Sequence, residues 1–238
     1  MESFRKLNKR KVSESSYCNI FQSVLEIVLN DTDIDVDDGE NVSNSTRRMA
    51  ILNQYDEKGF GRRIDLITHE YHSSHDIEYC GIEFKKESVN TSLLQHQQSK
   101  NIRINGTILN DSILLTKDLS QGCIFMDWFG PTGYMVELFK YKNCHVAYHI
   151  SSLHLPTTLL ELDDFRETVK HLYKWKTKLV EVSRGMKLAL LKDKRKYETI
   201  TISTSTTPTT SPNRSPPLLP IDIFFTPNKN KKVKKAID

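Results

Sequence analysis

Two short segments carry acidic and basic side chains at a spacing that could bind a metal ion. Residues 61–67 (GRRIDLI) place one acid, Asp65, at the start of an apolar run, and residues 81–85 (GIEFK) place Glu83 two positions before Lys85. Alternate side chains of a β-strand share one face, so Glu83 and Lys85 point the same way. If the two strands pair, Asp65 and Glu83 can converge on one divalent cation, with Lys85 beside it.

The chemistry that such a group could perform is phosphodiester hydrolysis. Carboxylates without a soft ligand nearby predict Mg²⁺ or Mn²⁺ as the cofactor. A bound metal ion lowers the pKa of its water and polarises a phosphoryl oxygen, and a lysine stabilises the developing negative charge. The alternative interpretation is an ion pair on a solvated hairpin.

Hydrophobic periodicity predicts the elements that must position these residues. A helix is expected from Ser13, with an apolar face that includes Tyr17 and Phe21, and a short helix over Arg47–Tyr55. The residues between Asn30 and Asn44 are rich in Asp and predict a solvated loop. A helix over Ser88–Asn110 has Leu93, Leu94, Ile102 and Leu109 partly in phase, and a long helix follows Pro156. The predicted strands are Ile64–Thr68, Glu78–Lys86, Ile124–Phe129, Tyr134–Tyr141 and His145–Leu153.

This order of helices and strands predicts one α/β domain over residues 13–192, with a mixed sheet flanked by helices and a long C-terminal helix. Residues 1–12 form a basic arm, which is predicted to be disordered. Residues 193–238 form a disordered tail, since 16 of the 22 residues between Thr199 and Pro220 are Thr, Ser or Pro.

The charge divides along the same boundaries. The chain of 238 residues has a formal net charge of +4, but residues 13–192 contain 20 basic and 25 acidic side chains. The basic residues of the arm and of Lys229–Lys235 are typical of nuclear-import signals, which predicts an import receptor as a partner and the nucleus as the location, with the cytoplasm as the alternative. No apolar run is long enough to cross a bilayer, so no membrane partner is expected. The four cysteines are widely spaced and predict reduced core thiols.

The pattern of Asp65 followed by Glu83-Phe84-Lys85, with a helix before and a helix after, resembles the PD-(D/E)XK nuclease superfamily, which has the restriction-endonuclease-like fold. The wider arrangement from Ser13 is also similar to proteins abundant in early-diverging fungi. The resemblance covers roughly residues 13–185. It implies a core of helix, three or more strands, helix and strand, with Asp65 and Glu83 as metal ligands, Lys85 as a catalytic lysine and nucleic acid, DNA above all, as the substrate.

Many members of that superfamily add an acid from the first helix. Here Glu26 lies opposite the apolar stripe, whereas Glu14 lies at its edge and can face the sheet, so Glu14 is the candidate. The alternative role for Glu14 is to complement the helix dipole. Gln97, Gln98 and Lys100 on the following helix could contact a nucleic-acid backbone, or the glutamines could be ordinary surface residues.

Two rival functions remain open at this point. One is a binding module for nucleic acid or protein that keeps the fold without turnover. The other is an interaction protein that acts through its tail, where the apolar residues 218–225 (LLPIDIFF) have the size of a docking peptide.

Overall fold

Helices and strands follow one another around a single sheet in the computed structural model, which describes residues 13–39, 42–54, 61–72, 75–142 and 144–202, with side chains up to residue 192. The helices are α2 (Glu14–Leu29), α3 (Asn44–Leu52), α4 (Thr91–Thr116) and α5 (Leu162–Ile202), with the 3-10 turn η1 (Leu159–Glu161) before α5. The strands are β1 (Asp35–Asp38), β2 (Leu66–His72), β3 (His75–Lys85), β4 (Gly122–Phe129), β5 (Thr132–Tyr141) and β6 (Cys144–His154). The arm, residues 1–12, and the tail beyond Ile202, with Lys229–Lys235, lie outside the described residues.

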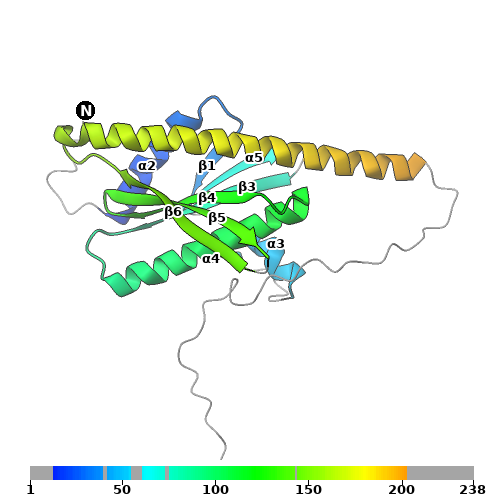
Figure 1. The fold of residues 1–238 in the computed structure, drawn as a ribbon, viewed down its shortest axis with the longest axis horizontal. Helices are drawn as coiled ribbons and strands as arrows, with labels where there is room; N and C mark the ends of the chain where they lie inside the picture. Colours follow the sequence, from blue (N-terminus) through cyan, green and yellow to red (C-terminus); the bar gives the residue numbers. More distant parts are fainter. Residues whose placement is uncertain (1–12, 40–41, 55–60, 73–74, 143, 203–238) are drawn as a thin grey trace, which may run out of the picture.

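The six strands form one sheet in chain order, β1-β2-β3-β4-β5-β6. Only β3 and β4 are parallel among these neighbours, because α4 carries the chain across the sheet between them. Helices α2 and α5 cover one face of the sheet and α4 covers the other (Figure 1). The predicted α/β class, with a mixed sheet flanked by helices and a long C-terminal helix, is confirmed.

Aromatic side chains pack α2 against the sheet. The ring of Phe21 lies 4.5 Å from that of Trp128 and 6.0 Å from that of Phe84, centroid to centroid. Gly133 on β5 lets the indole of Trp128 lie flat against the backbone, since a Cβ there would come within 2.5 Å of the ring. All three rings are buried. This packing fixes the start of α2 near the end of β3.

The predicted elements agree with the fold at most positions. Ser13 is the N-cap of α2, and its side chain accepts a hydrogen bond from the backbone N–H of Ser16. The last five strands occur where the sequence predicts them, with ends shifted by a few residues. Helix α5 continues past the predicted domain end at Lys192 as far as Ile202. No helix among the described residues is long and apolar enough to span a bilayer.

Two predictions from the sequence are wrong. The Asp-rich residues predicted as a solvated loop contain strand β1, in which Asp37 pairs with Ile67 of β2. An edge strand tolerates acidic residues because one side of it faces water, and backbone pairing with β2 supplies the order. The four cysteines are also not all core thiols, since Cys144 is exposed and Cys18 is only half-buried, whereas Cys80 and Cys123 are buried.

Candidate functional site

The pairing of β2 with β3 holds Asp65 near Glu83. The two strands are antiparallel, with Leu66 opposite Ile82, so Asp65 at the start of β2 lies across from Glu83. Oδ2 of Asp65 accepts a 2.7 Å hydrogen bond from the backbone N–H of Phe84. The fold therefore brings together the two carboxylates that the sequence places on separate segments.

Glu83 is a buried acid with a strongly shifted pKa. Its side chain is 1% exposed, and Oε1 accepts a 2.6 Å hydrogen bond from the ammonium group of Lys100 on α4. Burial raises the pKa of Glu83 to about 7, and the negative charge of Asp65 adds to this rise against the opposing charges of Lys100 and Lys85. Two acids of like charge in a poorly solvated place are a position where a divalent cation would be stabilising.

Lys85 joins the strand to the first helix. Its ammonium group lies 3.1 Å from Oε1 of Glu14 in the first turn of α2. Burial alone would lower the pKa of Lys85, but the hydrogen bond to Glu14 and the charges of Asp65, Glu14 and Glu83 raise it above its usual value. Lys85 is therefore a permanent cation at neutral pH. Glu14 lies at this site as geometry predicts, in contact with the lysine, whereas Glu26 is exposed.

Asp127 is a third acid at this end of the sheet, and the sequence analysis missed it. It lies opposite Glu83 in the parallel pair of β3 and β4, and it is 2% exposed. Its Oδ1 accepts from the side-chain amides of Asn101 at 2.8 Å and Gln97 at 3.3 Å. Its Oδ2 accepts from the hydroxyl of Tyr134 at 3.1 Å. Burial raises the pKa of Asp127 despite these donors, and the charge of Lys85 opposes the rise.

Helix α4 buries a row of amides against the sheet. Gln97, Asn101 and Asn105 are spaced four residues apart and all three are buried. Asn105 bonds the backbone N–H and C=O of Gly81 on β3 at 2.8 and 3.0 Å. Of the residues predicted to be partly in phase on this helix, Leu109 is buried, whereas Leu93 is 52% exposed. The spacing of four was the signal in the sequence that could have revealed the row.

The predicted nucleic-acid contacts on α4 separate into three cases. Gln97 is buried and donates to Asp127, so it does not lie on the surface as a backbone contact requires. Gln98 is exposed, as the prediction requires. Lys100 is 39% exposed in its side chain and is paired with Glu83, so it belongs to the carboxylate site itself.

An open cavity of about 550 Å³ leads to Asp65 from the start of α2. Three acids line it, Glu14, Asp38 and Asp65, while Lys86 adds one positive charge. Burial and the charges of these acids raise the pKa of the Cys18 thiol in its wall to about 12. The thiol is therefore protonated at neutral pH in the metal-free protein. A phosphate group would be repelled from this cavity unless a cation neutralised the acids.

The donors present suit a hard divalent cation. Asp65 and Glu83 offer carboxylate oxygens, and no further hydrogen bond from the described part of the chain reaches either carboxylate beyond those from Phe84 and Lys100. Within the same described residues, no group of three or more His, Cys, Asp or Glu side chains is arranged to hold a metal ion. Two carboxylates with water in the other positions is a ligand set that Mg²⁺ commonly takes.

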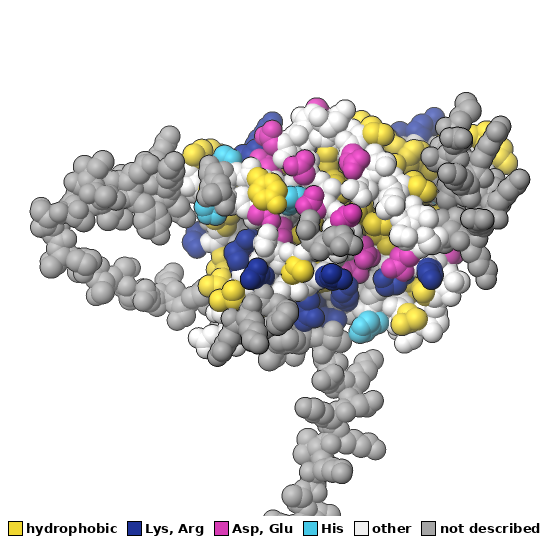
Figure 2. Space-filling view, turned by 180° about the vertical axis from the view of Figure 1, so that it is seen from behind, with side chains coloured by type: hydrophobic (Ala, Val, Ile, Leu, Met, Phe, Trp, Pro, Cys, Tyr) yellow, Lys and Arg dark blue, Asp and Glu magenta, His cyan; other side chains and the backbone are white. Residues whose placement is uncertain are grey.

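The face of the molecule opposite to that of Figure 1 carries both signs of charge. Acidic side chains gather in its centre, and a band of Lys and Arg side chains lies below them (Figure 2). A surface of this kind provides local cations rather than a uniform positive field.

No protein-family model matches the chain, and no curated protein and no solved structure matches it either. The resemblance to PD-(D/E)XK nucleases therefore stays a prediction from the sequence.

Proposed function

We propose that this protein is a divalent-metal-dependent nuclease, or a domain descended from one, that hydrolyses phosphodiester bonds of nucleic acid. The observation that carries the proposal is the position of Asp65 beside the buried Glu83, where burial and the charge of Asp65 raise the pKa of Glu83, with the cation Lys85 next to both. Strained acid pairs of this kind are common at catalytic sites, because binding energy of the cofactor offsets the repulsion.

The order of elements supports the restriction-endonuclease-like core. Helix α2 precedes the antiparallel strands β1, β2 and β3, and α4 then leads to β4, parallel to β3. Apart from the short helix α3 between β1 and β2, and the strands β5 and β6 after β4, this order is compatible with the succession of helix, three strands, helix and strand that the resemblance implies. The carboxylates lie at the carboxyl end of β3, beside the carboxyl end of its parallel neighbour, where sites of α/β sheets commonly form.

Each side chain has a role in the proposed hydrolysis. Asp65 and Glu83 would hold Mg²⁺ or Mn²⁺, which when bound supplies an activated water and polarises the phosphoryl oxygen. Lys85 stabilises negative charge on the phosphoryl group, and it is too basic to act as a general base. Glu14 orients Lys85 through the 3.1 Å ion pair. Asp127 is a positioning residue that faces the same lysine across the sheet.

Nucleic acid, DNA above all, is the proposed substrate, and the nucleus is the proposed location, with the cytoplasm as the alternative. The acid-rich domain gives no general attraction for phosphates, so local lysines, the metal ion and the basic ends must supply it. An import receptor that binds Lys229–Lys235 remains part of the proposal, on residues outside those described.

The test is cleavage of plasmid and single-stranded DNA by the full chain with Mg²⁺ or Mn²⁺. We expect the Asp65→Ala/Glu83→Ala variant, and separately Lys85→Met, to lose cleavage by roughly 100- to 1000-fold or more. The matched control is Glu26→Ala, which removes an exposed acid from α2 and should cleave like the parent chain. Equal cleavage by the parent and the double variant would refute the catalytic assignment.

A second candidate function is a binding module of the same fold without turnover. One observation favours it, because both carboxylates already have partners without a metal ion. Lys100 forms an ion pair with Glu83, and the backbone N–H of Phe84 donates a hydrogen bond to Asp65. Calorimetry separates the two functions. A module of this kind binds nucleic acid or protein without taking up Mn²⁺ at Asp65 and Glu83, whereas the nuclease takes up Mn²⁺ and loses it in the double variant.

A further inference from the structure

A small apolar cavity lies far from the carboxylate site, where α3, α4, β3 and α5 meet. Its volume is about 260 Å³, and its exposed wall is mostly apolar, although Arg48, Asp76, Glu78 and Asp111 also line it. Leu52 at the end of α3 is one wall and is 50% exposed, as is its neighbour Ile51. The cavity therefore reaches the surface at Leu52, beside the exposed Ile51. Its other apolar lining residues are Ile77, Leu114, Leu115 and Met186.

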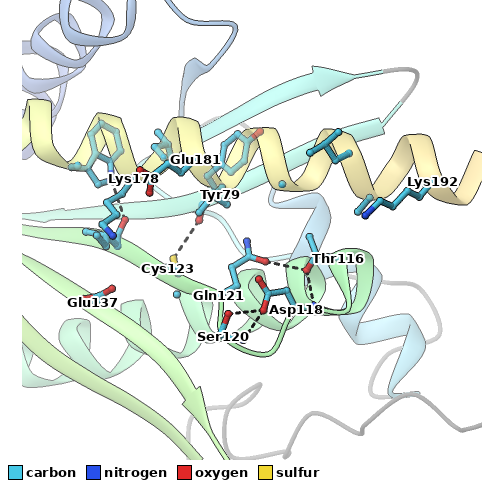
Figure 3. A pocket seen from close by; sticks show the side chains of 18 residues that line it. Tyr79, Thr116, Asp118, Ser120, Gln121, Cys123, Glu137, Lys178, Glu181 and Lys192 are labelled. Atoms are coloured by element: carbon cyan, nitrogen blue, oxygen red, sulfur yellow. Dashed lines mark hydrogen bonds between the residues drawn. The ribbon is translucent and has the colours of Figure 1, made fainter.

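A larger cavity beside α5 differs in character. It has a volume of about 540 Å³, and Lys178 and Glu181 of α5 line it together with Asp118 and Ser120 from the segment before β4 (Figure 3). Charged and hydroxyl groups in its wall would lose hydration if an apolar segment covered them. The smaller cavity is therefore the better receptor for apolar side chains, and its size suits one aromatic ring.

The chain itself contains a segment of matching chemistry. Residues 218–225 (LLPIDIFF) hold seven apolar residues and one acid, and they end in Phe224-Phe225. They stand in a tail otherwise dominated by Ser, Thr, Pro and Lys. Five lysines follow over residues 229–235, while the cavity wall carries three acids, Asp76, Glu78 and Asp111, against one arginine, Arg48, which pairs with Asp111. The segment and the residues that follow it therefore complement the cavity in both apolar surface and charge.

The length of chain allows the segment to reach the cavity. Helix α5 runs from Met186, in the cavity wall, to Ile202, and this part is about 24 Å long at 1.5 Å per residue. About 15 residues join Ile202 to Leu218. Such a connection spans up to about 50 Å when extended, which is twice the distance needed.

We propose that residues 218–225 dock on this cavity in the same molecule, with a phenylalanine ring in the space beside Leu52. Burial of one phenylalanine side chain favours the docked state by roughly ten- to a hundred-fold. Tethering adds to this, because the segment is held at high effective concentration near the cavity. The proposal is independent of the nuclease activity.

The test is hydrogen–deuterium exchange of the full chain, followed by mass spectrometry. We expect the amides of residues 218–225 to exchange roughly tenfold or more slowly than those of residues 203–217. The variant Leu52→Glu should remove this protection, since it places a charge at the mouth of the cavity. The variant Phe224→Ser/Phe225→Ser should do the same, because it removes the rings that would fill the cavity. The matched control is Leu188→Glu, an exposed leucine of the other cavity, which should leave the protection unchanged.

Three results would overturn the proposal. Residues 218–225 could exchange as fast as their neighbours in the parent chain. The protection could survive Leu52→Glu while circular dichroism shows a folded variant, which would place the segment elsewhere. The protection could also disappear on dilution together with a dimer in sedimentation, which would assign the cavity to a second copy of the chain.

Discussion

Strand β3 carries two buried glutamates, Glu78 and Glu83, whose environments differ. Glu78 accepts three hydrogen bonds from the start of α3: from the hydroxyl of Ser43 at 2.6 Å and from the backbone N–H groups of Asn44 and Ser45. Glu83 has one ion pair, with the half-exposed Lys100, and a second acid as its neighbour. Burial raises the pKa of both side chains. The two side chains differ in how many hydrogen bonds offset the cost of burying the negative charge.

The donors at the start of α3 offset part of the cost of burying the charge of Glu78, because a carboxylate at a helix N-terminus satisfies backbone N–H groups and complements the dipole. The charge of Glu83 opposes folding, because burial and Asp65 both disfavour it. The comparison teaches that burial alone does not mark a functional acid. A better sign of a functional acid is a buried carboxylate that accepts few hydrogen bonds and has a second carboxylate as its neighbour.

The largest expected effect is an opposite response to the same substitution at pH 8. The amide group of Glu78→Gln cannot accept from all the donors of α3, so we expect a loss of roughly 1–3 kcal/mol in the free energy of unfolding. We expect Glu83→Gln to gain stability in metal-free protein, because it removes the disfavoured charge. Urea denaturation of both variants beside the parent chain measures the two changes.

The pH dependence of the free energy of unfolding tests independently whether the charge of Glu83 opposes folding. The pKa of Glu83 is about 7 in the folded chain and near 4.5 when unfolded, so the folded state binds the proton more tightly. Its contribution is present below pH 4.5 and is lost as the pH rises through 7, by up to about 3 kcal/mol. The parent and Glu83→Gln should therefore be similar at pH 5 and diverge at pH 8. A destabilised Glu83→Gln at pH 8 would make Glu83 a structural acid like Glu78.

A smaller difference between two substitutions is expected at Asp127, which accepts several hydrogen bonds as Glu78 does and lies beside Glu83 in the sheet. Asp127→Ala leaves the buried amides of Gln97 and Asn101 without this acceptor, and we expect a loss of roughly 2–4 kcal/mol. Asp127→Asn keeps an oxygen toward the amides and turns its NH₂ toward the hydroxyl of Tyr134, so its loss should stay below about 1 kcal/mol. Thermal denaturation of the pair distinguishes a need for hydrogen bonds from a need for charge. Equal losses would show that the charge of Asp127 itself stabilises the fold.

The smallest effect is the pH dependence of metal binding. A carboxylate must lose its proton to bind Mn²⁺, so the dissociation constant should rise about tenfold for each pH unit below 7 and level off above about pH 8. Titration calorimetry at several pH values measures it, and Glu78→Gln is the control that should bind as the parent does. An affinity that stays constant between about pH 6 and pH 7 would exclude Glu83 as a ligand.

Local patterns in the sequence were enough for most of the elements. The apolar periodicity and the Ser13 cap give α2, and the apolar runs give the last five strands. Strand β1 could not be read from its Asp residues, because its order comes from pairing with β2. The sequence analysis missed the amide row of α4 for a related reason. Gln97, Asn101 and Asn105 are polar, and they are core residues only because backbone groups and acids of the sheet accept hydrogen bonds from them and donate hydrogen bonds to them.

The candidate site likewise has features that local sequence patterns predict and features that depend on the tertiary structure. The sequence by itself determined that Glu83 and Lys85 share one face of a strand, that Asp65 begins the neighbouring strand, and that Glu14 lies at the edge of its helix, because each depends on the local period of a helix or a strand. Only the tertiary structure decided that Asp127 lies beside Glu83, that Lys100 pairs with it, and that Gln97 is buried. These contacts depend on the parallel pairing of β3 with β4 across α4, and no local period encodes a pairing between strands so far apart in the chain.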